Sequence, residues 1–336
     1  MIIPVKTTLG GYDIILKRGA LQKAEEYLNL NRKVLIVTDS GVPDVYAQAI
    51  SKKCKESKIF VFQEGEQSKN FDTYKNILSA LCQGEFTRSD CVVAVGGGVV
   101  GDMAGFAAAS YMRGIDFYNI PTTVLSQVDS SIGGKTAIDF MGYKNIIGAF
   151  YQPKCVIIDS ETLKTLPPRQ ISNGLAESVK MALTSDKELF ELFENEDIQD
   201  NIDEIIYRSL LIKKSVVEQD EKETGLRKIL NFGHTVGHAI ESVNIDKYYH
   251  GECVALGMLY FSGPKVKPRL INVLKKLNLP VEDTTKIEDI ISASAHDKKK
   301  SGSSICVVSV ESVGEFSLEN IDFNTYSDII RKAAKQ

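Results

Sequence analysis

The sequence predicts an α/β fold in which a parallel sheet with its helices is followed by an all-helical domain. Three observations support this prediction. Short runs rich in β-branched residues alternate with amphipathic stretches as far as residue 160. After Leu166-Pro167-Pro168 the apolar residues recur at helical spacing instead. The 336 residues are also enough for two domains. We therefore expect an α/β domain over residues 1–160 and a helical domain over residues 161–336.

Four strands are expected in the first domain, because short apolar runs are typical of strands that are buried on both faces of a sheet. They lie at residues 34–37, 59–62, 91–95 and 156–158. An amphipathic stretch at residues 74–81 predicts a helix between the second and third of these strands. Strands that are separated by helices usually pair in parallel, which predicts a parallel sheet.

Six helices are expected in the second domain from the spacing of its apolar residues. They lie at residues 174–183, 188–194, 202–217, 230–243, 254–259 and 270–277. The one notable charge run, Lys298-Lys299-Lys300, follows them. Runs of this kind ordinarily face solvent.

The composition is that of an ordinary globular protein, with 43% hydrophobic and 25% charged residues and a net charge of −4. This balance provides no basic surface for nucleic acid, so small molecules are the expected partners. We find no signal-peptide pattern and no apolar run long enough to span a bilayer, which predicts a cytoplasmic protein without a membrane partner. The six cysteines are scattered without paired spacing, as expected for reduced thiols.

A glycine-rich turn directly follows the strand expected at residues 91–95. Residues 96–101, Gly-Gly-Gly-Val-Val-Gly, satisfy the G-x-G-x-x-G pattern and open a stretch of small residues. Backbone N–H groups at such a helix start bind phosphate, although glycine turns also form for steric reasons alone. No acidic residue ends a strand about twenty positions later, where the dinucleotide-binding pattern places one. Asp39, upstream at the end of another strand, is the better candidate for a ribose contact.

A second group of polar residues falls in a glycine-rich, weakly periodic region that we expect to form loops. Loops of this kind often carry binding groups, and three cations near an asparagine suit an anionic, hydroxyl-rich ligand. The alternative is a solvated loop. The group consists of Arg113, Pro121-Thr122-Thr123, Asp129, Lys135 and Lys144-Asn145.

Three of the four histidines, His234, His238 and His250, fall in one short stretch. His234 and His238 are four residues apart, so a helix would project both from one face. If this helix begins near Gly225, Arg227 and Asn231 extend the same polar row. This crowding predicts a divalent-metal site, or a ligand site with a proton-transfer partner. The alternatives are a solvated helix face and structural histidines.

Several motifs, in order and with compatible spacing, resemble the 3-dehydroquinate synthase family between about residues 39 and 299. They are Gly-Gly-Gly-Val-Val-Gly-Asp102, Pro-Thr-Thr123, Gly-Gly-Lys135-Thr, Leu-Pro-Pro-Arg169, Ala-Glu177-Ser-Val-Lys180, Gly225-Leu-Arg-Lys-Ile-Leu-Asn231-Phe-Gly-His234-Thr-Val-Gly-His238-Ala and His250-Gly-Glu252. The resemblance implies a Rossmann-like N-terminal domain, a helical C-terminal domain, bound NAD and a divalent metal, usually zinc, with cobalt as an alternative.

The resemblance also implies roles for individual residues. The metal ligands would be Glu177, His234 and His250, and His238 and Glu223 would transfer protons. The substrate contacts would be Asp129, Lys135, Asn145, Lys180, Lys213, Arg227, Asn231 and Lys298, with Lys299 as the alternative to Lys298, and with Arg113 reaching in from the partner subunit of a homodimer. The NAD contacts would be Asp39, Glu66, Lys69, Gly97, Gly98, Val99, Asp102, Thr122, Thr123, Lys144, Thr162, Leu163, Lys164 and Thr165.

Two of these groups have ordinary alternatives. Glu177 and Lys180 are three residues apart, so they share a helical face and could form a surface ion pair. Lys213 lies on an amphipathic pattern and could be a solvated lysine.

The activity that the resemblance implies is the conversion of 3-deoxy-arabino-heptulosonate 7-phosphate, a phosphorylated sugar acid, to 3-dehydroquinate and phosphate in the shikimate pathway of aromatic amino acid biosynthesis. The steps would be transient oxidation by NAD⁺, elimination of phosphate, return of the hydride and aldol closure. NAD would act as a catalyst, since it is regenerated in each turnover.

Three other functions stay open at the level of the sequence. Another sugar-phosphate cyclase, of the 2-deoxy-scyllo-inosose or valiolone synthase type, would share the fold and cofactors. A metal-dependent polyol dehydrogenase would release NADH, although its uncharged substrate leaves the cations unexplained. A binding protein without activity is the third, since fold alone does not establish catalysis. The segment 259–278 departs from the family: it is roughly ten residues shorter than expected and contains two prolines that interrupt helices.

Overall fold

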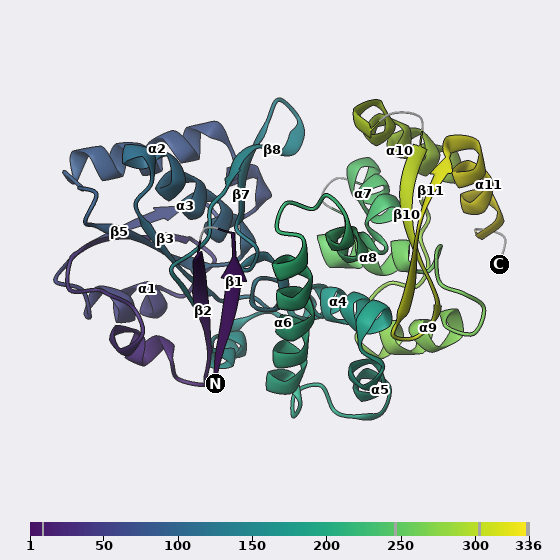
Figure 1. Ribbon diagram of the computed structural model, residues 1–336, viewed down its shortest axis with the longest axis horizontal. Helices are drawn as coiled ribbons and strands as arrows, with labels where there is room; N and C mark the ends of the chain where they lie inside the picture. The colour runs from purple at the N-terminus through teal and green to yellow at the C-terminus, as the bar shows by residue number, and fades with distance from the viewer. Residues whose placement is uncertain (9, 245–246, 302–303, 334–336) are drawn as a thin grey trace. The chain divides into compact units, whose positions relative to one another are not determined.

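The computed structural model describes residues 1–8, 10–244, 247–301 and 304–333, without the side chains of residues 296–301. The chain divides into two compact units, Met1–Pro167 and Pro168–Gln336 (Figure 1). Among the described residues, no helix has the length and apolar character needed to cross a membrane.

The first unit is built on a seven-stranded sheet. Its strands lie in the order β1 (Ile2–Thr7), β2 (Gly10–Leu16), β9 (Cys155–Ile158), β6 (Asp116–Pro121), β5 (Cys91–Gly96), β3 (Lys33–Asp39) and β4 (Glu56–Phe62). Only the β1–β2 pair is antiparallel among these neighbours. The helices are α1 (Asp44–Ser51), α2 (Phe71–Gln83) and α3 (Gly98–Ser110), with the short helices η1 (Leu21–Glu26), η2 (Glu66–Ser68), η3 (Tyr111–Arg113), η4 (Ser126–Ser130) and η5 (Ser160–Thr165).

The sheet is covered on both faces, which explains its continuous apolar strands. Successive residues of a strand point to opposite faces. Leu35 and Val37 pack in one core with residues of α2 and α3. Val34 and Ile36 pack in the other core with residues of α1 and η1. The predicted parallel α/β domain is therefore confirmed, including the four expected strands and the helix at residues 74–81.

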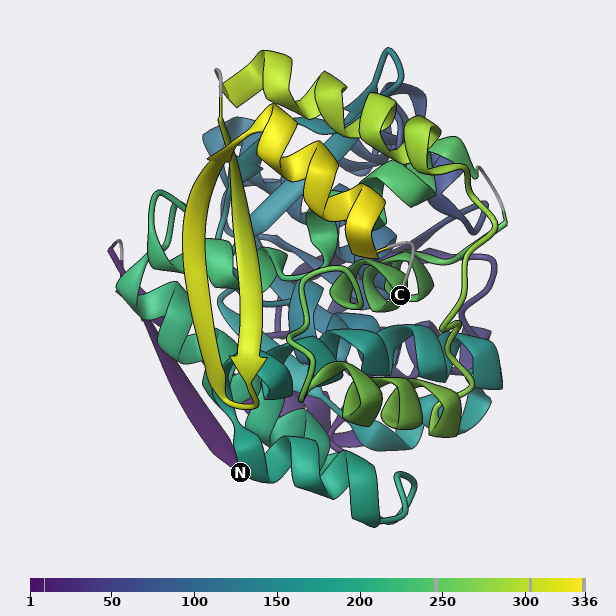
Figure 2. The same ribbon diagram turned by 90° about the vertical axis from the view of Figure 1, so that its right-hand side faces the viewer.

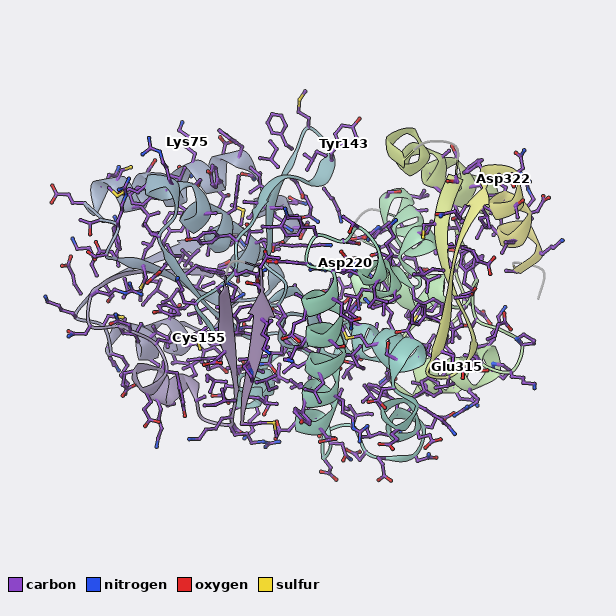
Figure 3. All side chains as sticks on the ribbon, viewed as in Figure 1. Lys75, Tyr143, Cys155, Asp220, Glu315 and Asp322 are labelled. Atoms are coloured by element: carbon purple, nitrogen blue, oxygen red, sulfur yellow. The ribbon has the colours of Figure 1, made fainter. Side chains whose placement is uncertain are left out.

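The glycine-rich region after Asp129 is not only loop, as the sequence suggested. Residues 135–150 form an antiparallel hairpin of β7 (Lys135–Phe140) and β8 (Tyr143–Phe150). Tyr143 marks its tip in Figure 3. Most residues of β8 are exposed, so this strand lacks the buried apolar run from which the other strands were predicted.

The second unit is mainly helical, as predicted. Its helices are α4 (Pro168–Ser185), α5 (Lys187–Asn195), α6 (Ile202–Gln219), η6 (Leu226–Asn231), α7 (His234–Val243), α8 (His250–Met258), α9 (Lys267–Lys276), α10 (Ile287–Ser301) and α11 (Phe323–Ala333). It also contains an antiparallel hairpin of β10 (Ser304–Ser312) and β11 (Glu315–Asp322), which Figure 2 shows beside α11. The expectation of an all-helical domain missed this hairpin, because six of the eight residues of β11 are exposed and this strand has no apolar run.

The two prolines of segment 259–278 separate helices rather than bend them. Pro264 lies in the turn between α8 and α9, and Pro268 lies in the first turn of α9. The first turn of a helix needs no N–H donor from proline, so this position carries no penalty.

The helix predicted at residues 230–243 begins later than expected. Short helix η6 ends at Asn231, and Gly233 takes a left-handed conformation with φ of 77° before α7 starts at His234. Arg227 and Asn231 therefore do not share a helix with His234 and His238, and the predicted polar row along one helix is wrong. Glycine adopts positive φ without steric cost, which explains the break.

Glycines let α7 and α8 pack with their backbones almost in contact. A Cβ atom added at Gly257 would lie 2.0 Å from the Gly233 carbonyl oxygen and 2.8 Å from the Gly237 nitrogen. A Cβ atom at Gly237 would lie 2.9 Å from the Cys253 carbonyl oxygen. Because these neighbours are backbone atoms, they cannot move aside as a flexible side chain would.

We expect Gly257→Ala to destabilise the protein by about 1–3 kcal/mol or more, the usual cost of overpacking a tight core. For a domain of this size the loss corresponds to a fall in Tm of roughly 3–10 °C, measurable by thermal unfolding. An unchanged Tm would contradict the close contact of α7 and α8.

Candidate functional site

The residues predicted to form a site fall into two groups, one in each unit. In the first group, Asp39 and the turn at Gly97 lie at the carboxyl edge of the seven-stranded sheet, whereas Arg113 comes just before β6 and so lies at the amino end of that strand. The second group surrounds a buried carboxylate between helices α4, α7 and α8.

Asp39 and Gly97, two of the predicted cofactor contacts, lie at the switch point of the parallel sheet. From β3 the chain moves outward to β4, and from β5 it moves the opposite way to β6. Ligands of open α/β sheets bind beyond the carboxyl ends of the strands at such a point. Asp39 ends β3, and Gly97 follows β5 as the N-cap of α3. The structure therefore brings the two halves of the predicted cofactor site to neighbouring strands.

The predicted threonines lie against the glycine turn. Thr122 donates its N–H to the Gly96 carbonyl at 2.9 Å. A Cβ atom at Gly97 would lie 3.2 Å from Thr123 Cγ2, so the turn and the threonine loop pack closely. Burial raises the pKa of Asp39, even though its carboxylate accepts the N–H of Gly41 at 2.9 Å.

Lys69 links Asp102, which the family resemblance gives as an NAD contact, to Asn145, which it gives as a substrate contact. Its ammonium group lies 2.6 Å from Asp102 Oδ2 and donates to Asn145 Oδ1 at 2.5 Å, and Lys69 is only 5% exposed. Burial alone would lower the pKa of Lys69, but the carboxylates of Asp102 and Glu66 outweigh it and raise this pKa. Asn145 has φ of 54°, and its N–H donates to Asp139 at 2.7 Å. Asp102, a predicted cofactor contact, and Asn145, a predicted substrate contact, thus share one lysine.

The remaining predicted residues of this unit vary in exposure. Thr162 and Thr165 both contact the hydroxyl of Tyr46, while Leu163 is buried and Lys164 pairs with Glu161. Asp129 is half-buried in η4. The exposed ones are Glu66, Arg113, Lys135, Lys144, Lys164 and Thr165.

The second group is centred on Glu177, which is fully buried in α4. Its Oε2 accepts a hydrogen bond from the ammonium group of Lys180, one turn further along the helix. Its Oε1 has no hydrogen-bond partner among the described residues, and it lies 3.5 Å from His234 Nε2 and 3.4 Å from His250 Nε2. The alternative of a surface ion pair is therefore wrong, since both partners are buried.

The charges of this group depend on one another. Burial opposes ionisation of Glu177, but Lys180, His234 and His250 outweigh burial and hold the pKa of Glu177 well below its usual range. Burial, with the positive charge of Lys180, lowers the pKa of His234 well below its usual range. Burial also acts against protonation of His250, but its contacts with Glu177 and Glu241 raise that pKa to about 9.

The three atoms fit a divalent cation. Ligand atoms at about 2.0–2.2 Å from a tetrahedral ion lie about 3.3–3.5 Å from each other. The separations of Glu177 Oε1 from the two histidine nitrogens match this value. The buried oxygen makes no hydrogen bond and needs a positively charged neighbour, which either a protonated His250 or a divalent cation supplies. His238 joins His234 and His250 in a cluster whose candidate ligand atoms lie within 4.8 Å of one another, but it is the exposed member.

The imidazole rings of His234 and His250 are each oriented by a contact of Nδ1, the ring nitrogen that does not face Glu177. His234 Nδ1 lies 3.2 Å from the Phe232 carbonyl oxygen, and His250 Nδ1 lies 3.4 Å from Glu241 Oε2. Metal-binding histidines commonly have such a partner, which fixes the tautomer. We did not predict Glu241 from the sequence, although it lies seven residues after His234 and so on the same side of α7.

Further predicted residues lie within the same unit. Lys213 and Arg227 are buried, so the alternative of a solvated Lys213 is wrong. Asn231 donates to Glu223 Oε1 at 2.7 Å, which joins a predicted substrate contact to a predicted proton carrier. Lys298 lies in α10, but its side chain and that of Lys299 are outside the described part of the structure.

Comparison with known proteins agrees with this architecture. The model of the 3-dehydroquinate synthase N-terminal domain matches residues 59–173, and the model of the C-terminal domain matches residues 174–300. The chain belongs to the 3-dehydroquinate synthase family. A 3-dehydroquinate synthase of Streptococcus thermophilus is 39% identical over 355 residues, covering 99% of this chain and 100% of the relative.

Two solved structures of sugar-phosphate cyclases share the fold of this family member. One is a 2-deoxy-scyllo-inosose synthase in complex with carbaglucose-6-phosphate, NAD⁺ and Co²⁺, with a TM-score of 0.86, 27% identity and 99% coverage of both chains. The other is 2-epi-5-epi-valiolone synthase from Streptomyces hygroscopicus with NAD⁺ and Zn²⁺, with a TM-score of 0.87, 25% identity, and coverage of 96% of this chain and 97% of that one.

Asp220 organises the loop that carries Glu223 and leads to Arg227 (Figure 3). Its carboxylate accepts the N–H groups of Thr224, Gly225 and Arg227 at 2.7–3.0 Å. Burial alone would raise the pKa of Asp220, but these three N–H donors outweigh it and lower the pKa from 3.8 to about 2. A carboxylate with a lowered pKa stabilises the fold at pH values above its unfolded pKa, and this contribution is lost as the pH falls toward the folded value.

We expect Asp220→Asn to be less stable than the wild type at pH 7, because an amide N–H₂ would face backbone donors. The difference in the free energy of unfolding should shrink as the pH falls from about 5 to 3. Urea unfolding at several pH values measures this difference, and a difference that stays constant with pH would contradict the role of the carboxylate.

Proposed function

We propose that this chain is a 3-dehydroquinate synthase that converts 3-deoxy-arabino-heptulosonate 7-phosphate to 3-dehydroquinate and phosphate. The observation that supports this most directly is the unpartnered, buried Oε1 of Glu177 facing two histidines. It occurs in a chain whose residues 59–173 and 174–300 match the N-terminal and C-terminal domain models of this family. In the proposed assignment, residues 1–160 bind NAD together with contacts at residues 162–165, and the rest of residues 161–336 holds the metal and much of the substrate site.

Glu177, His234 and His250 are the proposed metal ligands. A carboxylate and two imidazoles suit zinc or cobalt and leave coordination positions for substrate oxygens. When bound, the metal would supply Lewis acidity toward a substrate hydroxyl. Lys180 neutralises the second oxygen of Glu177, and this leaves Oε1 oriented toward the histidines.

The carboxyl edge of the sheet is the proposed NAD site. Asp39, at the end of β3, would accept hydrogen bonds from the hydroxyls of a ribose, and the turn at Gly97 with the start of α3 would offer backbone N–H groups to phosphate oxygens. NAD⁺ would supply a hydride acceptor that returns the hydride within the same turnover. The other proposed contacts are Glu66, Lys69, Gly98, Val99, Asp102, Thr122, Thr123, Lys144, Thr162, Leu163, Lys164 and Thr165.

Buried cations support an anionic substrate. Lys180, Lys213 and Arg227 are each 5% exposed or less in the unit that contains the proposed metal ligands. A substrate with a carboxylate and a phosphate can form charge-assisted hydrogen bonds with such groups in addition to their contacts within the protein, whereas an uncharged polyol forms only weaker ones. This contrast disfavours a polyol dehydrogenase. The other proposed substrate contacts are Asp129, Lys135, Asn145, Asn231 and Lys298, with Arg113 supplied by the partner subunit of a homodimer.

His238 and Glu223 are the proposed proton carriers. The ring of His238 lies 5.2 Å from that of His234 and 5.7 Å from that of His250, centroid to centroid, and it is the exposed member of the cluster. A nitrogen there can exchange protons with a ligand and with solvent. Glu223 holds the amide of Asn231, so it can orient a substrate contact as well as accept a proton.

Another sugar-phosphate cyclase is the nearest alternative. The identity to the 3-dehydroquinate synthase of Streptococcus thermophilus is 39%, against 27% and 25% for the two cyclase structures. This difference favours the dehydroquinate reaction. A cytoplasmic location and a homodimer remain predictions.

The overall activity is tested with purified protein and 3-deoxy-arabino-heptulosonate 7-phosphate. We expect release of inorganic phosphate that requires both NAD⁺ and a divalent metal, without accumulation of NADH. Phosphate is measured by a colorimetric assay and NADH by absorbance. Stoichiometric NADH production from a polyol, without phosphate release, would contradict the proposal, and a different carbocyclic product would indicate another cyclase.

A pair of histidine variants separates proton transfer from metal binding. His238→Ala should keep the bound metal and lower kcat by about 10²–10⁴-fold, the contribution of a positioned acid or base. His250→Ala, its matched control, should lose the metal. Metal content by elemental analysis and kcat measure both effects. If His238→Ala loses the metal as His250→Ala does, the ligand set is the three histidines instead.

A further inference from the structure

Arg169 ends the Leu-Pro-Pro-Arg motif, and the proposed function gives it no role. Its guanidinium group forms a two-pronged contact with Glu252, with Nε 2.7 Å from Oε1 and Nη2 2.8 Å from Oε2. It also lies 4.3 Å from the ring centroid of Tyr249. Planar, paired contacts of this kind fix geometry as well as charge.

The Arg169 contact holds the start of α8, where His250 is the first residue. Glu252 is 6% exposed, and its Oε2 also accepts the N–H of Tyr249 at 2.9 Å. Tyr249 and Glu252 therefore lie on either side of His250 and are joined to each other. Arg169 also donates to the Lys247 carbonyl at 2.9 Å, which ties down the approach to the helix.

Asn173 provides a second attachment one turn further along α4. Its Oδ1 accepts the N–H of Gly251, the residue after His250, at 2.6 Å. A Cβ atom at Gly251 would lie 1.9 Å from the Asn173 carbonyl oxygen, so the backbones of α4 and α8 touch here. Both attachments lie within three residues of His250.

Arg169, Asn173 and Glu177 are at positions i, i+4 and i+8 of α4, which places them along one side of the helix. The helix that carries the buried carboxylate thus also holds the turn that carries His250. We propose that the Arg169–Glu252 pair, supported by Asn173, is a positioning device that sets His250 at coordinating distance from Glu177. This proposal rests on the proposed metal site.

The pair can act in this way because the coordinating distance tolerates little error. Histidine Nε2 and carboxylate Oε1 lie 3.4 Å apart, and a shift of the first turn of α8 would move His250 directly. Removal of Arg169 leaves the Glu252 carboxylate buried with the Tyr249 N–H as a remaining donor, so the turn would rearrange to solvate it. Loss of groups that orient metal ligands typically weakens metal binding by about 10–100-fold.

The second unit offers a matched control. Arg269 makes the same two-pronged contact with Glu194, with Nε 2.7 Å from Oε1 and Nη2 2.6 Å from Oε2. Its guanidinium group lies 5.3 Å from the ring centroid of Phe190. Arg269 is on α9 and Glu194 on α5, neither of which carries a proposed ligand. Arg269→Met therefore removes an equivalent ion pair without affecting α8.

The test compares Arg169→Met with Arg269→Met in the full chain. The dissociation constant for Zn²⁺ is measured by competition with a chelator, the visible absorption is recorded with Co²⁺ in place of zinc, and Tm is measured for the metal-free proteins. We expect Arg169→Met to raise the Zn²⁺ dissociation constant about 10–100-fold and to alter the Co²⁺ spectrum. Arg269→Met should leave both unchanged while lowering Tm to a similar extent. Arg169→Lys, which keeps the charge but not the two-pronged contact, should be intermediate.

Equal Zn²⁺ dissociation constants for Arg169→Met, Arg269→Met and wild type would overturn the positioning role while leaving the proposed metal site intact. A wild type that binds no Zn²⁺ would overturn the metal site and this proposal together. If Arg169→Met does not fold, Glu252→Gln replaces it, since the amide oxygen can still accept the N–H of Tyr249. The same increase in the dissociation constant is expected for that variant, and no increase would contradict the proposal.

Discussion

The second unit depends on the burial of one negative charge. A carboxylate removed from water costs several kcal/mol unless cations or donors surround it. Glu177 is fully buried, and its own helix supplies a cation for only one of its two oxygens. The other oxygen draws on His234 of α7 and His250 of α8. Three helices must therefore converge on one atom, and a divalent cation is the partner that would satisfy all three groups together.

Close convergence requires helices without bulky side chains at their contacts. Gly237 and Gly257 allow α7 and α8 to meet backbone to backbone, and Gly251 does the same for α8 and α4. Gly233 also separates two helices. Its left-handed conformation interrupts the helical backbone after η6 and lets α7 begin in a new direction. The glycines of the Gly-His-Thr-Val-Gly-His motif are thus part of the site: they set the distances between the groups that carry the chemistry.

The sequence predicted those strands, helices and site residues whose pattern lies within one short segment of the chain. The strands of the parallel sheet are buried on both faces, so their apolar runs were visible, and the crowding of His234, His238 and His250 pointed to a metal site without any structure. The hairpin of β7 and β8 and that of β10 and β11 were missed because β8 and β11 lack such runs. The break at Gly233 was missed because helical spacing continues across it. Glu241 was missed because its contact with His250 joins two helices.

The carboxyl edge of the sheet shows how charge is distributed in the first unit. Lys69 is buried, and its ammonium group is already bound by Asp102 and Asn145, so its charge is largely offset within the protein. An anion at this edge would gain less from Lys69 than its position in the sequence suggests. In the proposed NAD site, the dipole and backbone N–H groups at the start of α3 would then be the main attraction for a phosphate, since no side-chain cap neutralises their partial charge. Lys69 also ties Asn145, and with it strand β8, to Asp102 of α3.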